Sequence, residues 1–177
     1  ALEKAYRKGK LQVPVLRGVE VNVKKGEFVY VVGHSGAGKS TLLALILRRL
    51  VATQGAVYFA GQNLKPLRGD QVAYHRRRIG MVFQDHRLLS DMTVEENLTM
   101  PVTMALHDVP SEVQALVRDV ALEVGLSVAD LSRRAGELDL GHRARLRLGR
   151  ALAPSPALLL AEHPNATLGS GALAFAA

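Results

Sequence analysis

A glycine-rich stretch near the start of the chain limits the folds that are open to it. Residues 33–40 read GHSGAGKS and fit the phosphate-binding loop pattern GxxxxGK(S/T) at every fixed position. Apolar β-branched and aromatic residues at 28–32 precede this stretch, and a leucine-rich run at 41–50 follows it. Strand, loop and helix thus come in the order that such a loop requires. The sequence predicts an α/β fold with a nucleotide triphosphate site at the loop.

The chemistry of a phosphate site explains the residues of this loop. Glycines permit positive φ angles and let backbone N–H groups approach a phosphate closely. Lys39 can reach the β- and γ-phosphates as a point charge, and the Ser40 hydroxyl can bind Mg²⁺. Thr41 is assigned either to packing or to the other phosphates of the nucleotide. A chance glycine-rich turn is the alternative, and the two matching flanks favour the phosphate loop.

Composition excludes several classes of protein. The chain has 177 residues, of which 48% are hydrophobic, so it can bury a core and is not disordered. It has no cysteine, which excludes disulfides and thiolate chemistry. No apolar run approaches the roughly 18 residues that a membrane span needs, and charges interrupt residues 1–16, so we expect neither a span nor a signal peptide. The expected location is the cytoplasm.

The net charge of +7 raises nucleic acid or an anionic membrane surface as partners. The arginines gather at 76–78, 133–134 and 143–150, without interleaved aromatic residues that could stack on bases. We therefore expect a solvated basic face, one that can lie near lipid headgroups, and no nucleic acid partner.

Further elements follow from local pattern. Strands are expected at 11–23, 56–60, 78–83 and 157–161, and a turn at 24–27. Capping boxes at Thr93 and Ser111 predict helix starts, and an arginine-rich helix is expected at 142–153. The helix after Ser111 has an apolar stripe with helical spacing and a stop at Gly125. The stripe consists of Val113, Leu116, Val117, Val120, Ala121 and Val124.

Three segments together carry a family resemblance. GHSGAGKST at 33–41, RRRIGMVFQDHRLL at 76–89 and PALLLA at 156–161 resemble the nucleotide-binding domain of ATP-binding cassette (ABC) proteins. Within that family, residues 80–89, followed by Thr93, Val94 and Asn97, resemble the cell-division ATP-binding protein FtsE. The resemblance covers most of the chain and is most specific at residues 4–97.

The resemblance implies a fold and an arrangement of domains. Members have a P-loop NTPase fold of ABC type, with a parallel-sheet core, an antiparallel β subdomain and a helical subdomain. In this chain the helical subdomain is expected at about residues 85–150 of a single domain spanning 1–177. The family's later switch histidine, strand and helix have no counterpart, so the resemblance implies a domain truncated at its C-terminus.

The resemblance also implies site residues. Tyr6 resembles the aromatic residue that stacks on adenine, and Gln84 the glutamine that senses Mg²⁺ and the attacking water. Glu162 falls at the position of the Mg²⁺-associated aspartate, so the implied metal residues are Ser40, Gln84 and Glu162. The implied catalytic residues are Gln84 and His163. The implied nucleotide-binding residues are Tyr6, Gly33, His34, Ser35, Gly36, Ala37, Gly38, Lys39, Ser40 and Thr41.

Two motifs depart from the family pattern. Residues 138–142 read LDLGH where members carry LSGGE or LSGGQ, so Asp139 would place a carboxylate beside the phosphate that the motif grips. His163 stands where members have the glutamate that polarises the attacking water. A mispositioned or lost general base lowers the rate by about 10²- to 10⁴-fold. These departures predict impaired or absent hydrolysis.

The leading expectation is an FtsE-like subunit in cell division that binds ATP and Mg²⁺ and lies peripherally on the inner face of the membrane. Its expected partners are an FtsX-like membrane subunit and a second ATP-binding subunit, in a homodimer or a heterodimer. One alternative is an active ABC transporter ATPase that powers export. Another is a structural scaffold that binds no nucleotide.

Overall fold

The chain forms two compact units, Ala1–Arg76 and Arg77–Ala177, in a computed structural model that describes residues 1–83, 88–105 and 112–162. Each unit has its own cluster of buried apolar side chains. Strands pair both antiparallel and parallel, and helices accompany them. The α/β class predicted from the sequence is confirmed.

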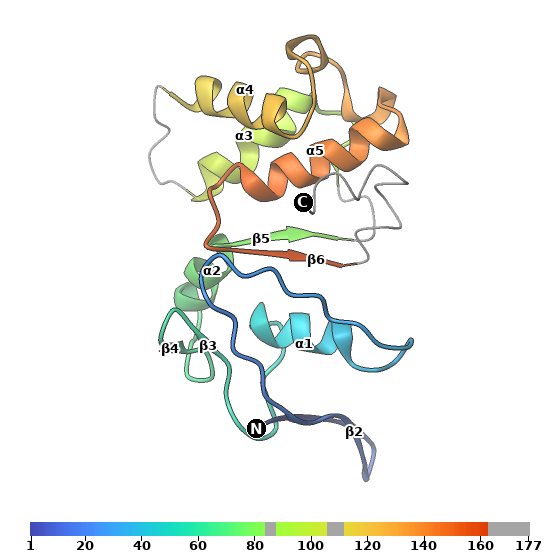
Figure 1. Cartoon of the computed structure of the whole chain (residues 1–177), viewed down its shortest axis with the longest axis vertical. Helices are drawn as coiled ribbons and strands as arrows, with labels where there is room; N and C mark the ends of the chain where they lie inside the picture. Colours follow the sequence, from blue (N-terminus) through green and yellow to red (C-terminus); the bar gives the residue numbers. More distant parts are fainter. Residues whose placement is uncertain (84–87, 106–111, 163–177) are drawn as a thin grey trace. The chain divides into compact units, whose positions relative to one another are not determined.

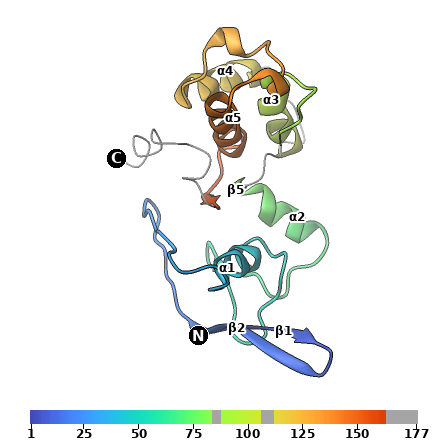
Figure 2. The same ribbon diagram turned by 90° about the vertical axis from the view of Figure 1, so that its right-hand side faces the viewer.

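The first unit is built on an antiparallel hairpin. β1 (Leu2–Lys8) pairs with β2 (Leu11–Val19), and α1 (Lys39–Ile46) lies against the hairpin (Figure 2). Leu2, Leu16 and Leu45 form the buried centre of this packing. The sequence pattern did not predict β1, because its residues are mostly polar and their strand conformation depends on pairing with β2. The expected strand at 11–23 ends at Val19.

Smaller elements complete this unit. β3 (Tyr58–Phe59) and β4 (Gln62–Asn63) form a tight hairpin, so the strand expected at 56–60 shrinks to two residues. α2 (Asp70–Arg77) follows. The His75 ring nitrogen Nε2 donates to the Ile46 carbonyl oxygen at 2.7 Å, and Arg76 Nε donates to the Leu47 carbonyl oxygen at 2.9 Å. These two bonds tie α2 to the end of α1.

The strand expected at residues 28–32 is not formed. Its apolar side chains are exposed, with Phe28 at 73% and Val32 at 86%. No strand of the described residues pairs with this segment. A run of β-branched and aromatic residues becomes a strand only when a neighbouring backbone accepts and donates its hydrogen bonds. The turn before it is as predicted, with Glu27 N donating to the Lys24 carbonyl oxygen at 3.1 Å.

The second unit contains a parallel pair of strands. β5 (Ile79–Val82) pairs with β6 (Leu158–Ala161), and α5 (Leu140–Leu152) lies beside them (Figure 1). A Cβ atom on Gly80 would collide with the Ala151 carbonyl oxygen, so glycine is what lets α5 approach β5 this closely. The strands expected at 78–83 and 157–161 are confirmed, and α5 confirms the helix expected at 142–153 with an earlier start.

α3 (Val94–Ala105), α4 (Val113–Glu123) and α5 pack into a bundle (Figure 2). The apolar stripe is confirmed, because all its members are buried except Leu116, which is half-buried. Gly125 ends this helix region with φ 80°. The capping box at Thr93 is confirmed, since Glu96 N donates to Thr93 Oγ1 at 3.1 Å and Thr93 N donates to Glu96 Oε2 at 2.7 Å. Ser111 lies outside the described residues.

Among the described residues, no helix combines the length and the apolar character that crossing a membrane would require.

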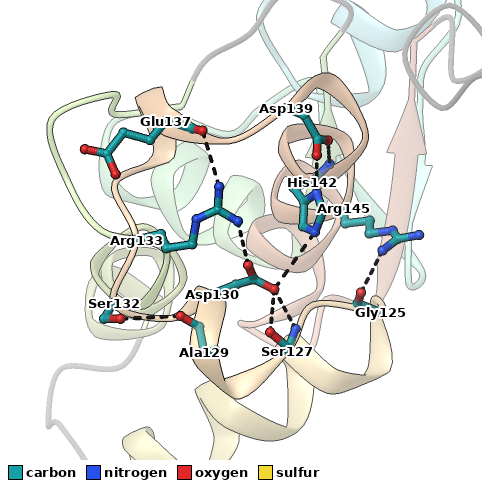
Figure 3. Close-up of polar contacts among 10 residues, drawn as sticks. All are labelled: Gly125, Ser127, Ala129, Asp130, Ser132, Arg133, Glu137, Asp139, His142 and Arg145. Atoms are coloured by element: carbon teal, nitrogen blue, oxygen red, sulfur yellow. Dashed lines mark hydrogen bonds and ion pairs between the residues drawn. The ribbon is translucent and has the colours of Figure 1, made fainter.

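A buried carboxylate organises the connection between α4 and α5, which contains the short 3-10 helices η1 (Val128–Asp130) and η2 (Ala135–Glu137). Asp130 is only 7% exposed and receives hydrogen bonds from Ser127 and Arg133 (Figure 3). The Ser127 hydroxyl lies 2.7 Å from Asp130 Oδ2, and Arg133 Nη1 lies 2.9 Å from Oδ1. These bonds, those from Ser127 above all, lower the pKa of Asp130 to about 2. The Ser-x-x-Asp spacing is a capping-box signal that could have identified this residue.

Asp130→Asn is expected to destabilise the chain in a pH-dependent way. A carboxyl group whose pKa is lower in the folded state contributes stability above its unfolded pKa and loses it as pH falls through the folded pKa. We expect a loss of roughly 2 kcal/mol in the free energy of unfolding at neutral pH, which disappears between about pH 4 and pH 2. Urea unfolding followed by circular dichroism measures this.

The matched control is Asp119→Asn, because Asp119 is exposed on α4. We expect that change to leave the unfolding free energy within about 0.5 kcal/mol of the original. A destabilisation by Asp130→Asn that is the same at all pH values would contradict the assigned role of the ionised carboxylate.

Candidate functional site

The glycine-rich segment forms a loop that leads directly into α1. Ala37 N donates to the His34 carbonyl oxygen at 3.2 Å, which closes a turn within the loop. Gly36 has φ 82° and Gly38 has φ 93°, in the left-handed region that favours glycine. Gly38 is also the N-cap of α1 and is buried. A Cβ atom there would lie 2.7 Å from Leu16 Cδ2, so β2 and the loop can meet only at a glycine.

Lys39 is folded back onto the loop. Its ammonium group donates to the Gly33 carbonyl oxygen at 2.7 Å and to the His34 carbonyl oxygen at 2.9 Å. The His34 ring is held as well, since its Nδ1 donates to the Ser35 carbonyl oxygen at 2.7 Å. Lys39 therefore places a positive charge inside the curve of the loop, where the sequence predicts that a phosphate binds.

The start of α1 adds to this positive character. The first N–H groups of a helix have no earlier helical carbonyl to bond, and the helix dipole is positive at this end. The N-cap Gly38 supplies no capping side chain, and the first turn contains no acidic residue. No negative side chain of this turn compensates the helix end, and an uncompensated helix start of this kind is suited to an anion.

Tyr6 lies next to the same helix. Its hydroxyl oxygen is 3.3 Å from Thr41 Oγ1, so β1 brings the predicted adenine-stacking residue to the first turns of α1. The Lys4 ammonium group lies 5.5 Å from the centre of the Tyr6 ring and donates to the Val51 carbonyl oxygen at 2.8 Å. An open pocket of about 330 Å³ adjoins this residue. It is lined by Lys4, Ala5, Tyr6, Arg7, Gln12, Leu50 and Thr53.

The structure thus brings together the nucleotide-binding residues predicted from the sequence, because Tyr6 and residues 33–41 all lie in the first unit. The other predicted residues lie in the second unit or outside the described residues. Glu162 follows β6 in the second unit, with its backbone N–H donating to the Val82 carbonyl oxygen at 3.0 Å. Gln84 and His163 lie outside the described residues. No group of three or more His, Asp or Glu residues that could hold a metal occurs within the described ranges.

In the segment at 138–142, the aspartate has a structural role as a helix cap. Asp139 is the N-cap of α5, and its Oδ1 accepts from the His142 backbone N–H at 2.8 Å. The His142 ring nitrogen Nδ1 donates to Asp139 Oδ2 at 2.7 Å (Figure 3). The bond from the His142 backbone N–H, the largest cause, and the bond from its ring lower the pKa of Asp139. The carboxylate therefore occupies one of the N–H groups with which a helix start can bind an anion. Leu140 beside it is 68% exposed.

Comparison with known proteins places the chain among ABC proteins, as the resemblance in the sequence implied. The ABC transporter family matches residues 16–166. The lipoprotein-releasing system ATP-binding protein LolD of Alcanivorax borkumensis is 39% identical over 168 residues, which are 94% of this chain and 73% of that protein. The methionine import ATP-binding protein MetN 2 of Pseudomonas aeruginosa is 36% identical over 94% of this chain, which spans half of that protein's length.

Solved structures agree with the sequence matches. The ATP-binding cassette MJ0796, in a dimeric post-hydrolysis state bound to ADP and phosphate, aligns with a TM-score of 0.85 at 31% identity. The alignment covers 97% of this chain and 75% of that chain. Since the family match extends over most of the sequence and the fold similarity over nearly all of it, the chain belongs to the ABC transporter family of ATP-binding proteins and has its P-loop NTPase fold.

Proposed function

We propose that the chain is the ATP-binding subunit of an ABC transporter and that residues 33–41 bind Mg-ATP. The observation that carries the proposal is the convergence of Lys39, the uncompensated start of α1 and the Tyr6 hydroxyl on one end of one helix. Because a nucleotide triphosphate has a polyanionic end and an aromatic end, a site for it needs all three.

Binding would proceed by exchange of partners within the loop. Lys39 exchanges the Gly33 and His34 carbonyl oxygens for β- and γ-phosphate oxygens, which are charged and make stronger hydrogen bonds. The backbone N–H groups at the start of α1 donate to the β-phosphate, and the Ser40 hydroxyl supplies one ligand to Mg²⁺. Tyr6 stacks on the adenine ring. Gln84 and Glu162 are assigned to the metal and its water through the family resemblance.

Hydrolysis is proposed to be impaired. At the start of α5, the Asp139 carboxylate takes the His142 backbone N–H that a γ-phosphate would otherwise use, and it would repel that phosphate. His163, in place of the family's glutamate, lacks the negative charge that orients and deprotonates the attacking water. A second ATP-binding subunit with an intact motif could act on the nucleotide held by this chain. This chain, whose own signature motif is altered, could not act on the nucleotide held by the second subunit.

The transport class is proposed from the relatives. LolD is named for lipoprotein release and MetN 2 for methionine import, and the identity to LolD extends over more of the relative's length. We therefore favour a subunit of a lipoprotein-releasing type of exporter, peripheral on the inner face of the membrane and bound to membrane-embedded subunits. Cell division with an FtsX-like partner is the second candidate. It depends on the match at residues 80–89, part of which lies outside the described residues.

Mg-ATP is expected to bind saturably to the purified chain, and Lys39→Ala is expected to weaken binding by about 10- to 100-fold because charged hydrogen bonds to phosphate are lost. Isothermal titration calorimetry measures this. Lys25→Ala is the matched control, since Lys25 is an exposed lysine in the turn at 24–27 and should leave the affinity unchanged. Absence of binding at millimolar ATP would contradict the proposal and favour a scaffold without nucleotide.

Phosphate release is expected to be slow with the chain alone. The chain is then mixed with a competent ATP-binding subunit, which should supply an intact signature motif to the nucleotide held by this chain. In this mixture, His163→Glu should raise the rate of phosphate release by about 10²-fold or more, because it restores the general base. A coupled phosphate assay measures it, with Lys39→Ala as the control that should show no release above that of the competent subunit by itself. A wild-type rate equal to that of the His163→Glu variant would show that His163 does not limit hydrolysis.

The membrane subunits of a lipoprotein-releasing system are expected to copurify with the chain in detergent, in preference to FtsX. Met104 is 68% exposed on α3, so Met104→Glu should reduce the recovered complex if the helical subdomain docks there. Val21→Glu changes an apolar residue of the first unit that is 64% exposed, close to the value for Met104, and should have no effect. Preferential recovery with FtsX would favour the cell-division role instead.

A further inference from the structure

One arginine of α5 is buried without partners for its charged end. Arg147 is only 6% exposed, and its Nε donates to the Arg143 carbonyl oxygen at 3.3 Å. Its terminal nitrogens Nη1 and Nη2 are shielded from solvent and make no hydrogen bond. Burial lowers the pKa of the guanidinium, which reflects the loss of hydration. A buried cation that keeps two donor groups unsatisfied is strongly unfavourable unless an anion meets it.

A second arginine lies one helical turn before it. Residues four apart share a face of a helix, so Arg143 and Arg147 are neighbours on α5. Arg143 donates through Nη2 to the Gly136 carbonyl oxygen at 2.6 Å, which fixes its side chain. Its Nε is buried and has no hydrogen-bond partner. The two side chains, four residues apart on α5, thus have three buried donor nitrogens without a hydrogen-bond partner.

The nearby carboxylates do not supply the missing partner. Asp130 is bonded to Ser127 and Arg133, and Asp139 is bonded to His142 (Figure 3). Within the described residues, no ion pair joins either arginine to an acidic side chain. Arg145, on the same helix, differs because it is exposed and donates to the Gly125 carbonyl oxygen at 2.8 Å. The unsatisfied donors are therefore a property of the buried face of α5.

We propose that Arg143 and Arg147 bind an oxyanion of the phosphate class at this face of α5. The planar guanidinium fork of Arg147 can donate to two oxygens of one anion, and Arg143 Nε, one helical turn away, is a further donor. A carboxylate has only two oxygens and one negative charge, whereas phosphate has further acceptors and about two negative charges to set against two guanidinium groups. Arg143 is half-buried, so part of its side chain is exposed to solvent beside the buried Arg147.

This site is distinct from the phosphate loop, because α5 belongs to the second unit and residues 33–40 to the first. The two can therefore be tested separately. Lys39→Ala removes the principal charge of the loop and leaves α5 unchanged. Phosphate binding that remains in the Lys39→Ala chain reports on the α5 site. If no phosphate binds to that chain, the α5 proposal fails and the proposed nucleotide function is unaffected.

The experiment measures binding of inorganic phosphate to the Lys39→Ala chain by equilibrium dialysis at constant ionic strength. We expect one phosphate per chain, and at least about tenfold weaker binding after the further change Arg147→Met, which removes charged hydrogen bonds. Methionine is flexible and apolar, so the buried position can accept it. Arg145→Met is the matched control and should keep the affinity. Equal affinity in the Arg147→Met and Arg145→Met chains would overturn the proposal.

A second readout guards against misfolding. If the Arg147 guanidinium is unpaired without the anion, Arg147→Met should raise the urea midpoint of the phosphate-free chain, and phosphate should raise the midpoint only where Arg147 is present. A lower phosphate-free midpoint in Arg147→Met would show that the guanidinium already has a partner and would overturn the proposal. The same measurement with ADP in place of phosphate identifies the source of the anion. If only phosphate binds, the ligand is free phosphate. If both bind, the site also accepts a phosphate group carried by a nucleotide.

Discussion

The close approach of the phosphate loop to β2 is the constraint on which the first unit depends. Gly38 is buried against Leu16, with no space for a side chain, and it has a backbone conformation that favours glycine. This contact sets where α1 begins, and the start of α1 sets the direction of its first N–H groups. The same helix then carries Thr41 to the hydroxyl of Tyr6. A single glycine therefore couples the packing of the hairpin to the chemistry of the candidate site.

Buried polar groups organise the second unit in a comparable way. Asn97 is fully buried, and its side chain bonds both the N–H and the carbonyl oxygen of Leu89, which fixes the approach to α3. Asp130 does the same for the connection to α5. In both places the polar side chain satisfies backbone or charged groups that would otherwise be buried without partners. Arg147 is the exception among these groups, and its unsatisfied donors point to a ligand.

Asp139 shows how a capping carboxylate changes the groups that a helix start leaves available. A helix start binds an anion through N–H groups that the helix itself does not use. At α5 the His142 backbone N–H already donates to Asp139 Oδ1, and the His142 ring donates to Oδ2. This cap stabilises the helix start, and the proposal of impaired hydrolysis rests in part on it. At α1 the N-cap is a glycine, and the corresponding property is retained.

Local pattern in the sequence determined the phosphate loop, the capping box at Thr93, the apolar stripe of α4 and the strands that became β5 and β6, because spacing and turn chemistry act over a few residues. It also carried the family assignment. Only the tertiary structure decided that the polar residues of β1 form a strand, that residues 28–32 remain unpaired, and that Arg147 is buried without a partner. A strand depends on a neighbour's hydrogen bonds, and burial depends on what packs from elsewhere in the chain. The residues of the segment itself determine neither strand pairing nor burial.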